Sequence, residues 1–280
     1  QRKQMTTLGG NICAIALQGT FDDCQAMVKR AFNDPALNGK NLTSANSINI
    51  GRLIPQSVYY FKAYCEIGAS KIAFSVPCGN FGNLMGGVLA REMGLPVEKF
   101  IVAVNENDEF PRFLQTGIYK PVVPSKKCSS NAMNVGHPSN LARLIDFYGG
   151  WLMDERDADG NLIKKGVLKK TPDMDLMRKH FVSFSIKDEW VDRLIKKYYQ
   201  KYNILIEPHG AVSIAAALQA NLAMSVCCLE TADPAKFPEK IKQILHIEPP
   251  DLAFFSVLDN KEEKFIRIEN EYNRFVEIIL

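Results

Sequence analysis

The chain has 280 residues, 46% of them hydrophobic and 23% charged, which is typical of a soluble globular protein large enough to bury a core. Its formal net charge of +3 is small and its basic residues are scattered, so the composition does not indicate a nucleic-acid partner. Seven cysteines without a Cys-x-x-Cys pair argue against a disulfide framework and a zinc site, so we expect no metal and a reducing compartment. Without an apolar run of ~20 residues or a signal peptide, we expect a cytoplasmic protein that has no membrane partner.

The chain opens with QRKQMTTLGGN, which has no initiator methionine and already shows strand and turn character. We therefore expect a piece of a longer protein. Residues 9–19 predict a strand and residues 20–33 a helix, and a turn-like segment follows. The expected division is residues 1–42 as the remainder of a smaller α/β domain, and residues 43–280 as a large α/β domain with a C-terminal extension.

Residues 46–68 predict a long helix packed on a sheet. Apolar side chains recur at helical spacing on one broad face, and the first turn is unusually polar. The residues expected on the buried face are Ile50, Leu53, Ile54, Val58, Phe61 and Cys65.

A strand, a helix and a second strand are predicted next. Residues 71–77 are β-branched and stopped by a proline, residues 84–94 have helical spacing and end in glycine, and residues 100–104 are again β-branched. Such a βαβ unit implies parallel strands. The expected fold class is therefore α/β, with a mostly parallel sheet flanked by helices.

The segment CGNFGN joins the first of these strands to the helix, at the edge where parallel sheets bind ligands. Its backbone amides and the positive end of the helix dipole favour an anion. We expect Gly79 and Gly82 to allow close approach and to take positive φ. Asn80 and Asn83 can donate side-chain N–H groups or cap the helix.

Other interpretations of CGNFGN remain open. A plain tight turn between strand and helix would suit the same residues. A nucleoside triphosphate loop is disfavoured, because no Gly-Lys-Ser or Gly-Lys-Thr ending is present. A dinucleotide site lacks the G-x-G-x-x-G spacing, although Glu106 lies roughly where a ribose-binding acid is expected.

The rest of the chain predicts further helices and strands. The charged residues 154–175 indicate a solvated excursion with a hairpin around Asp159-Gly160, to which we assign no chemistry. The apolar residues 223–229 predict a buried strand followed by a polar loop and a helix. Other helices are expected at residues 141–148, 188–202 and 210–221, with a short strand at residues 204–206.

Three polar loops follow predicted parallel strands, at residues 78–83, 105–108 and 230–233, and should meet at one edge of the sheet. We expect a pocket there. The loops carry mostly hydroxyls and amides, with no Ser-His-Asp ordering and no obvious catalytic carboxylate pair. A cofactor should therefore supply the reactivity.

Six strings resemble, in this order, the threonine synthase family: SANSINIGRL, VPCGNFGNLMGG, NENDEFPRFL, SSNAMNVGHPSN, EPHGAV and ETADPAKFPEKI. Six ordered strings are more specific than any one of them. The resemblance implies a tryptophan-synthase-β-like fold of type II, the cofactor pyridoxal 5'-phosphate (PLP), and conversion of O-phospho-L-homoserine and water to L-threonine and phosphate. Residues 43–280 would then be the PLP-binding domain.

By this resemblance, the glycine loop holds the PLP phosphate, a dianion suited to charge-assisted hydrogen bonds from amides. Thr231 matches the hydroxyl residue that faces the pyridine nitrogen, a neutral partner that would leave this nitrogen largely unprotonated. A helix-capping role is the structural alternative for Thr231. The residues of the loop are Gly79, Asn80, Phe81, Gly82 and Asn83.

The resemblance also implies a binding site for a small phosphorylated amino acid. Asn49 and Arg52, at i and i+3 on one helical face, would hold its phosphate, because arginine offers a bidentate fork. A polar first turn that only caps its helix is the alternative. The matching residues are Ser44, Asn46, Ser47, Asn49 and Arg52.

Three positions depart from the family pattern. Cys78 replaces serine, Asn134 replaces aspartate, and Asp233 replaces a histidine near the expected pyridine ring. His209 in EPHGAV matches a family Pro-His position and is interpreted as structural, as a lone histidine between strand and helix usually is.

The family's Schiff-base lysine lies in a Phe-Lys-Asp string, and the sequence contains no such string. Phe61-Lys62-Ala63 is the nearest match, but Lys62 lies within a predicted amphipathic helix and is interpreted as a solvated side chain. The catalytic residue is therefore unknown, and the isolated chain, a monomer or homodimer, is expected to be inactive. The alternatives are a non-catalytic paralogue that binds a phosphorylated ligand and, less favoured, a dinucleotide-binding oxidoreductase domain.

Overall fold

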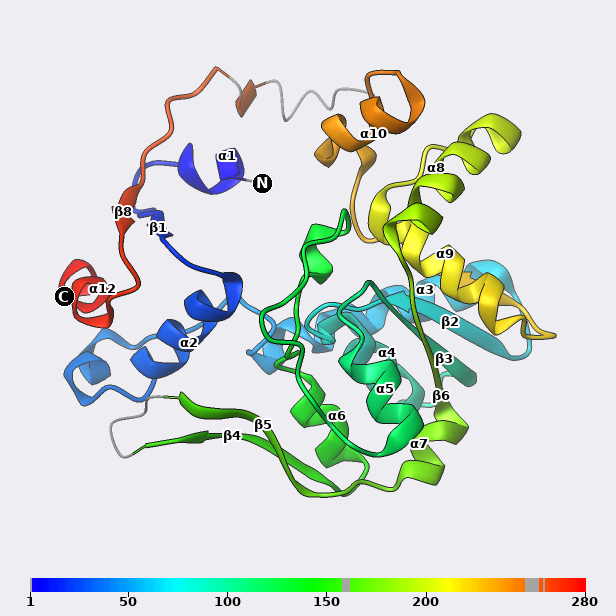
Figure 1. Cartoon of the computed structure of the whole chain (residues 1–280), viewed down its shortest axis with the longest axis horizontal. Helices are drawn as coiled ribbons and strands as arrows, with labels where there is room; N and C mark the ends of the chain where they lie inside the picture. Colours follow the sequence, from blue (N-terminus) through cyan, green and yellow to red (C-terminus); the bar gives the residue numbers. More distant parts are fainter. Residues whose placement is uncertain (1, 158–161, 250–256, 259) are drawn as a thin grey trace.

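A four-stranded sheet is the centre of the structure, a computed structural model that describes residues 2–157, 162–249, 257–258 and 260–280 (Figure 1). The strand order is β6-β3-β2-β7, and every neighbouring pair is parallel. The expected α/β class with a mostly parallel sheet is confirmed. The bounds are β2 (Ile72–Pro77), β3 (Val97–Val104), β6 (Phe181–Ser185) and β7 (Val226–Cys228).

Helices cover both faces of this sheet (Figure 1). Phe100 and Val102 of β3 pack into the core on one face, and Ile101 and Ala103 pack into the core on the other. The strand is buried on both sides, which explains its continuous apolar run. The first core includes α3 (Ser57–Ile67), α4 (Gly82–Glu92), α5 (Glu109–Thr116) and α6 (Leu141–Phe147), and the second includes α8 (Asp188–Tyr202), α9 (Pro208–Ala220) and α10 (Pro238–Leu245).

The predicted βαβ unit is confirmed as β2, α4 and β3. Two glycines allow α4 to pack closely against its neighbours. A Cβ on Gly86 would lie 2.8 Å from the Gln56 side chain, and one on Gly87 would lie 2.6 Å from the Tyr60 ring. Larger residues at these two positions would push α4 away from α3, and the start of α4 would move with it.

The long helix expected over residues 46–68 is wrong in its first half. Two short 3₁₀ turns, η2 (Ile50–Arg52) and η3 (Ile54–Gln56), precede α3, because Pro55 has no N–H for a continuous α-helix. The expected buried face is only partly right. Leu53 is fully buried, but Ile54 and Val58 are 56% and 64% exposed, and Ile50 and Cys65 are exposed as well.

Several strand predictions differ from the structure. Residues 204–206 form no strand, and β6, which the sequence did not predict, takes the edge beside β3. The strand expected at residues 9–19 is limited to β1 (Ile15–Leu17), and β7 is half-buried rather than buried. The helix at residues 188–202 is confirmed, and Trp190 in its first turn is 46% exposed.

The two ends of the chain meet away from the central sheet (Figure 1). β1 pairs in parallel with β8 (Ile266–Ile268), and the hydroxyl of Tyr272 donates to the Asp34 carboxylate over 2.7 Å. The division at residue 42 remains a prediction. Helices in this part are α1 (Arg2–Thr6), α2 (Phe21–Ala31) and α12 (Tyr272–Ile279), with the 3₁₀ turn η1 (Pro35–Lys40).

A two-stranded antiparallel hairpin lies beside the central sheet, formed by β4 (Trp151–Arg156) and β5 (Leu162–Lys170). The turn expected at Asp159-Gly160 lies outside the described residues. No helix of the described part is long and apolar enough to cross a membrane. The remaining elements are α7 (Met174–His180), η4 (Asn131–Met133) and η5 (Pro234–Lys236).

Candidate functional site

A cavity of about 710 Å³ lies at the carboxyl ends of β2 and β7. Two of the three loops expected there, those that follow β2 and β7, do line it, whereas residues 105–108 do not. The third wall is α3 with the turns before it. The lining residues are Ser47, Arg52, Gln56, Tyr59, Lys62, Ala63, Glu66, Asn80, Gly82, Asn83, Leu229, Glu230 and Thr231.

The glycine loop turns sharply from β2 into α4. The prediction that Gly79 and Gly82 take positive φ is wrong, because the left-handed residue is Phe81, with φ 63°. Its fully buried ring packs edge-on against Phe110, with centroids 5.1 Å apart, and this packing offsets the backbone strain. Gly79 is needed for close approach instead, since a Cβ there would lie 2.5 Å from the Ala132 carbonyl oxygen.

The backbone amides of this loop are available to a ligand. Among the described residues, none accepts a hydrogen bond from the N–H groups of residues 79–83. Phe81 caps α4 without a side-chain hydrogen bond, so the amides of Gly82 and Asn83 stay open in the cavity wall. With the helix dipole behind them, this arrangement of amides suits an anion.

The two asparagines of the loop mainly hold its shape. Asn83 donates from Nδ2 to the Pro77 carbonyl over 2.8 Å, and its Oδ1 accepts from the Leu84 N–H over 2.9 Å. Asn80 accepts at Oδ1 from the Ser139 N–H over 3.2 Å. One of the two Nδ2 hydrogens of Asn83 is therefore used within the loop, and both asparagines line the cavity.

Sequence reasoning missed two residues that tie the loop to its surroundings. Asn140, which is fully buried, donates from Nδ2 to the Asn80 carbonyl over 2.9 Å. The guanidinium of Arg143 donates both to the Asn140 side chain and to the Ile48 carbonyl. The only signal in the sequence was that Asn140 closes the string SSNAMNVGHPSN just before α6.

The residues predicted to contact substrate divide into two groups. Ser47 and Arg52 line the cavity, whereas the other three lie outside it and build the turn. Asn49 accepts at Oδ1 from the Gly51 N–H over 2.9 Å and donates to the Ser44 carbonyl over 2.8 Å. It caps a 3₁₀ turn instead of sharing an α-helical face with Arg52. Ser44 and Asn46 accept local backbone N–H bonds from Asn46 and Ile48.

Two cationic side chains reach the cavity. In the described part of the chain, the Arg52 guanidinium has no hydrogen-bond or ion-pair partner. The backbone carbonyl of Arg52 accepts from Gln56 Nε2 over 2.7 Å. Lys62, expected to be solvated, has a side chain that is 67% exposed but also lines the cavity, where its ammonium pairs with Glu66. Arg52 is therefore the cation that is open to an anionic ligand.

Glu230 and Thr231, in the loop that follows β7, also line the cavity. Glu230 accepts at Oε1 from the Glu207 N–H over 3.0 Å. Burial raises the pKa of the Glu230 carboxyl, and the charges of Glu207 and Asp233 add to this, against the opposing effect of the N–H bond. Asp233, a departure from the family, caps η5 by accepting from the Ala235 N–H over 2.9 Å.

The other two departures also have local explanations. Asn134 accepts at Oδ1 from Asn105 Nδ2 over 2.9 Å and from the Cys128 N–H over 3.0 Å. These bonds use the carbonyl oxygen that asparagine shares with aspartate. Cys78 is 2% exposed, and burial raises the pKa of its thiol well above the ordinary value. We therefore expect this thiol to stay protonated and unreactive.

Comparison with known proteins confirms the expected resemblance and the tryptophan-synthase-β-like fold. A family model described as threonine synthase, C-terminal, matches residues 210–279. A threonine synthase from Pseudomonas aeruginosa is 39% identical over 285 residues, 97% of this chain and 60% of its own. The PLP-bound threonine synthase from Brucella melitensis has a TM-score of 0.84 at 32% identity, over 99% of this chain and 61% of that one. The enzyme from Escherichia coli has a TM-score of 0.85 at 32% identity, over 99% and 60%. The chain thus spans about three-fifths of the length of these relatives.

Proposed function

We propose that this chain, which is homologous to the threonine synthases over nearly its whole length, forms the phosphate-binding side of a PLP site. The protein to which it belongs would convert O-phospho-L-homoserine and water to L-threonine and phosphate, as a PLP-dependent lyase of threonine biosynthesis. One observation carries the proposal: the open amides of the glycine loop, Thr231 and Arg52 line the same cavity.

The cavity fits the cofactor. The amides of Gly82 and Asn83 at the start of α4 suit a phosphate dianion, and Thr231 offers a neutral hydroxyl in the same space. When bound, PLP supplies the electron sink for carbanion chemistry at an amino acid. The chain's own contribution would be to grip the phosphate of the cofactor and to orient its ring.

The substrate phosphate would occupy a second position in the cavity. Arg52 has an open guanidinium fork, and Ser47 lies beside the glycine loop, since a Cβ on Gly82 would be 3.1 Å from the Ser47 Cβ. Cofactor and substrate phosphates would then be held by different groups of one cavity. The direct substrate role assigned to Ser44, Asn46 and Asn49 is reduced in the proposal to support of the turn that carries these groups.

The Schiff-base lysine would come from outside this chain. Lys62 is the lysine among the cavity-lining residues, and its ion pair with Glu66 occupies its ammonium. We therefore propose that the isolated chain binds PLP without turning over substrate. Formation of threonine from O-phospho-L-homoserine by this chain alone would contradict that part of the proposal.

The cofactor proposal is tested by titrating the full chain with PLP and with pyridoxal, which lacks the phosphate. We expect PLP to bind at least about tenfold more tightly, with a change in its visible absorption and in the ³¹P shift of its phosphate. Equal affinity for the two compounds, or binding of neither, would reject the phosphate site.

The substrate proposal is tested with Arg52→Gln, using calorimetric titration of O-phospho-L-homoserine into the PLP-loaded chain. We expect the affinity to fall at least about tenfold, because one charge-assisted phosphate contact contributes about 1.5–3 kcal/mol. Arg193→Gln is the matched control, since the Arg193 guanidinium lies over the Trp190 ring on α8. An equal loss in both variants would contradict a specific role for Arg52.

The second candidate is a non-catalytic protein that binds a phosphorylated ligand, for which the open amides and Arg52 of the cavity would suffice. This candidate predicts that the chain binds a phosphorylated ligand through its phosphate. It also predicts no turnover when the part of a relative that this chain does not match is added as a separate chain. The dinucleotide alternative loses its support, because Glu106 is not among the residues that line the cavity. We also propose a cytoplasmic location and a monomer or homodimer, on the composition alone.

A further inference from the structure

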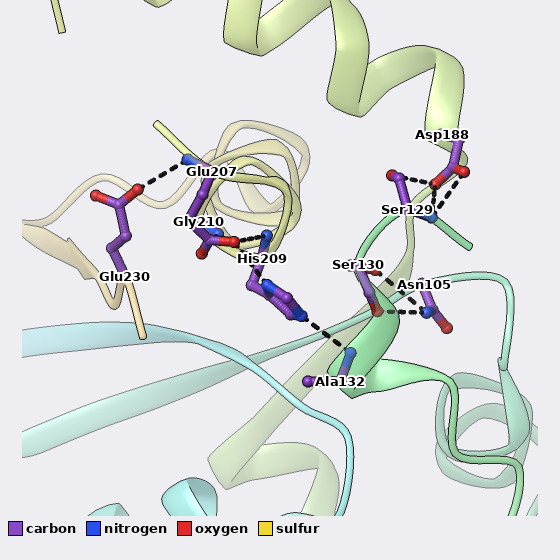
Figure 2. Close-up of polar contacts among 9 residues, drawn as sticks. All are labelled: Asn105, Ser129, Ser130, Ala132, Asp188, Glu207, His209, Gly210 and Glu230. Atoms are coloured by element: carbon purple, nitrogen blue, oxygen red, sulfur yellow. Dashed lines mark hydrogen bonds and ion pairs between the residues drawn. The ribbon is translucent and has the colours of Figure 1, made fainter. Parts of the chain in front are cut away.

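A buried carboxylate and histidine at the start of α9 lie between Glu230, which lines the cavity, and Ala132 of η4 (Figure 2). Glu207 is fully buried, and its Oε2 lies 2.6 Å from His209 Nδ1. Its two oxygens also accept the N–H groups of His209 and Gly210, each over 2.8 Å. On the other side of the imidazole ring, Nε2 accepts the Ala132 N–H over 3.2 Å.

These contacts fix the tautomer of His209. A backbone N–H can only donate, so Nε2 must be the unprotonated acceptor and Nδ1 must carry the proton that it donates to Glu207. The ring is 3% exposed and lies beside the Phe237 ring, with centroids 5.2 Å apart. The orientation of the imidazole is therefore set from both sides.

Ala132 is the residue against which the glycine loop rests. Its carbonyl oxygen lies where a Cβ of Gly79 would come within 2.5 Å, so η4 and the glycine loop are in tight backbone contact. A displacement of η4 by a few tenths of an ångström would therefore be transmitted to Gly79. The His209 bond acts on the very residue that makes this contact.

Other groups hold the ends of the same segment but not Ala132 (Figure 2). At one end, Asp188 accepts from the Ser129 N–H over 2.9 Å and Asn105 donates to Ser130 Oγ over 3.2 Å; at the other end, Asn105 Nδ2 donates to Asn134 Oδ1 over 2.9 Å. Because both ends are anchored, the position of Ala132 in the middle of the segment depends on the hydrogen bond that His209 Nε2 accepts from its N–H.

We propose that His209 is a positioning residue that sets the glycine loop, by holding Ala132 of η4 in place. This role deepens the proposed function: His209 affects PLP binding only if the glycine loop holds the PLP phosphate, as proposed above. His209 does not touch the cofactor in this role. Glu207 keeps the imidazole in the tautomer that can accept, and Ala132 passes the constraint to the loop whose amides grip the phosphate.

Two substitutions separate the two bonds of the ring. His209→Gln places an amide oxygen near the position of Nε2 and keeps an acceptor for Ala132, but it loses the donor to Glu207. His209→Asn keeps a donor near the position of Nδ1 but cannot reach Ala132. Both variants lose the ring that packs beside Phe237, so this loss is matched.

The primary readout is hydrogen exchange, in the full chain without cofactor, of the backbone amides of Ser139 and Asn140, which donate to Asn80 of the glycine loop. We expect His209→Asn to speed exchange there at least about tenfold and His209→Gln to stay near the wild-type rate. Equal exchange in the two variants, whether both change or neither does, would overturn the inference, because it would mean that the Ala132 bond does not matter.

A backbone change covers the case in which neither variant folds. Replacing Ala132 by lactic acid deletes its N–H and leaves the His209 ring intact. We expect the same faster exchange at the amides of Ser139 and Asn140, and an unchanged rate would overturn the inference.

PLP titration then separates this inference from the proposed function. If the wild-type chain takes up PLP, His209→Asn should bind it at least about fivefold more weakly than His209→Gln, and equal affinities would overturn the role. If the wild-type chain takes up no PLP, the proposed function fails, while the exchange rates still decide whether His209 positions the loop.

Discussion

Asn140 donates a hydrogen bond from Nδ2 to the carbonyl of Asn80 over 2.9 Å, while Arg143 joins Asn140 to the carbonyl of Ile48. The glycine loop and the segment before Arg52 are about 30 residues apart in the chain, yet they share this one anchor. The positions in the cavity of the glycine loop and of Arg52, the two groups proposed to bind phosphates, therefore depend on each other.

Asn140→Ala should loosen both walls of the cavity. The substitution leaves the buried Asn80 carbonyl with weaker bonding and Arg143 without a side-chain partner, which should cost about 1–3 kcal/mol of unfolding free energy. Denaturant unfolding measures this loss. The control is Asn131→Ala, whose exposed side chain lies on the same segment, and a similar loss in that variant would show that the effect is not specific.

Gly79→Ala should disturb the contact between the glycine loop and η4. Its Cβ would lie 2.5 Å from the Ala132 oxygen, so one of the two segments must move, at a cost of about 1–3 kcal/mol. We expect PLP affinity to fall at least about tenfold in a fluorescence titration. Gly39→Ala is the control, because a Cβ there meets nothing within 4 Å, and its stability should stay within about 0.5 kcal/mol of wild type. Unchanged PLP affinity in Gly79→Ala would argue against the loop as the phosphate site.

Lys62 should not form a covalent adduct with PLP, because its ammonium pairs with Glu66. After incubation with PLP and reduction with borohydride, peptide mass spectrometry should show no pyridoxyl group on residue 62. Lys62→Arg should therefore leave the non-covalent absorption change intact. A pyridoxyl-Lys62 peptide that disappears in Lys62→Arg would instead identify Lys62 as the Schiff-base residue.

Glu230→Gln should stabilise the protein at neutral pH. The pKa of Glu230 is raised in the folded state, so the folded protein holds this proton more tightly than the unfolded chain. Protonation of Glu230 therefore adds to the free energy of unfolding below the ordinary pKa of a glutamate, and this contribution is lost as the pH rises through the raised pKa. Glutamine keeps an oxygen for the Glu207 N–H and carries no charge.

The melting temperature of Glu230→Gln should therefore exceed that of wild type at pH 7, by no more than about 3 °C for a partly exposed group. The difference should shrink towards pH 4, where the wild-type carboxyl is protonated. A difference that is constant over this range would show that the carboxyl charge is not the cause.

Local sequence patterns were sufficient for the core of the fold. The alternation of apolar runs and glycine turns predicted β2, α4 and β3, and their parallel pairing placed the glycine loop at a ligand-binding edge. These features depend on residues close together in the chain, so a local pattern contains them. Pro55 was also visible in the sequence, and its missing N–H explains why the helix before it fails to form.

Contacts between residues far apart in the sequence decided the roles of the individual residues at the candidate site. The sequence determined that a loop rich in glycine and asparagine follows a buried parallel strand, and it predicted an anion site there. Only the tertiary structure decided that Ser47 and Arg52 reach the cavity while Asn49 caps a turn, and that Phe81 takes the left-handed conformation. It alone showed that Asn140 bonds to the loop, that Arg143 bonds to Asn140, and that His209 accepts a hydrogen bond from Ala132. The physical reason is that these roles depend on which backbone groups come within hydrogen-bonding distance once the layers have packed, and no periodicity in the sequence encodes those distances.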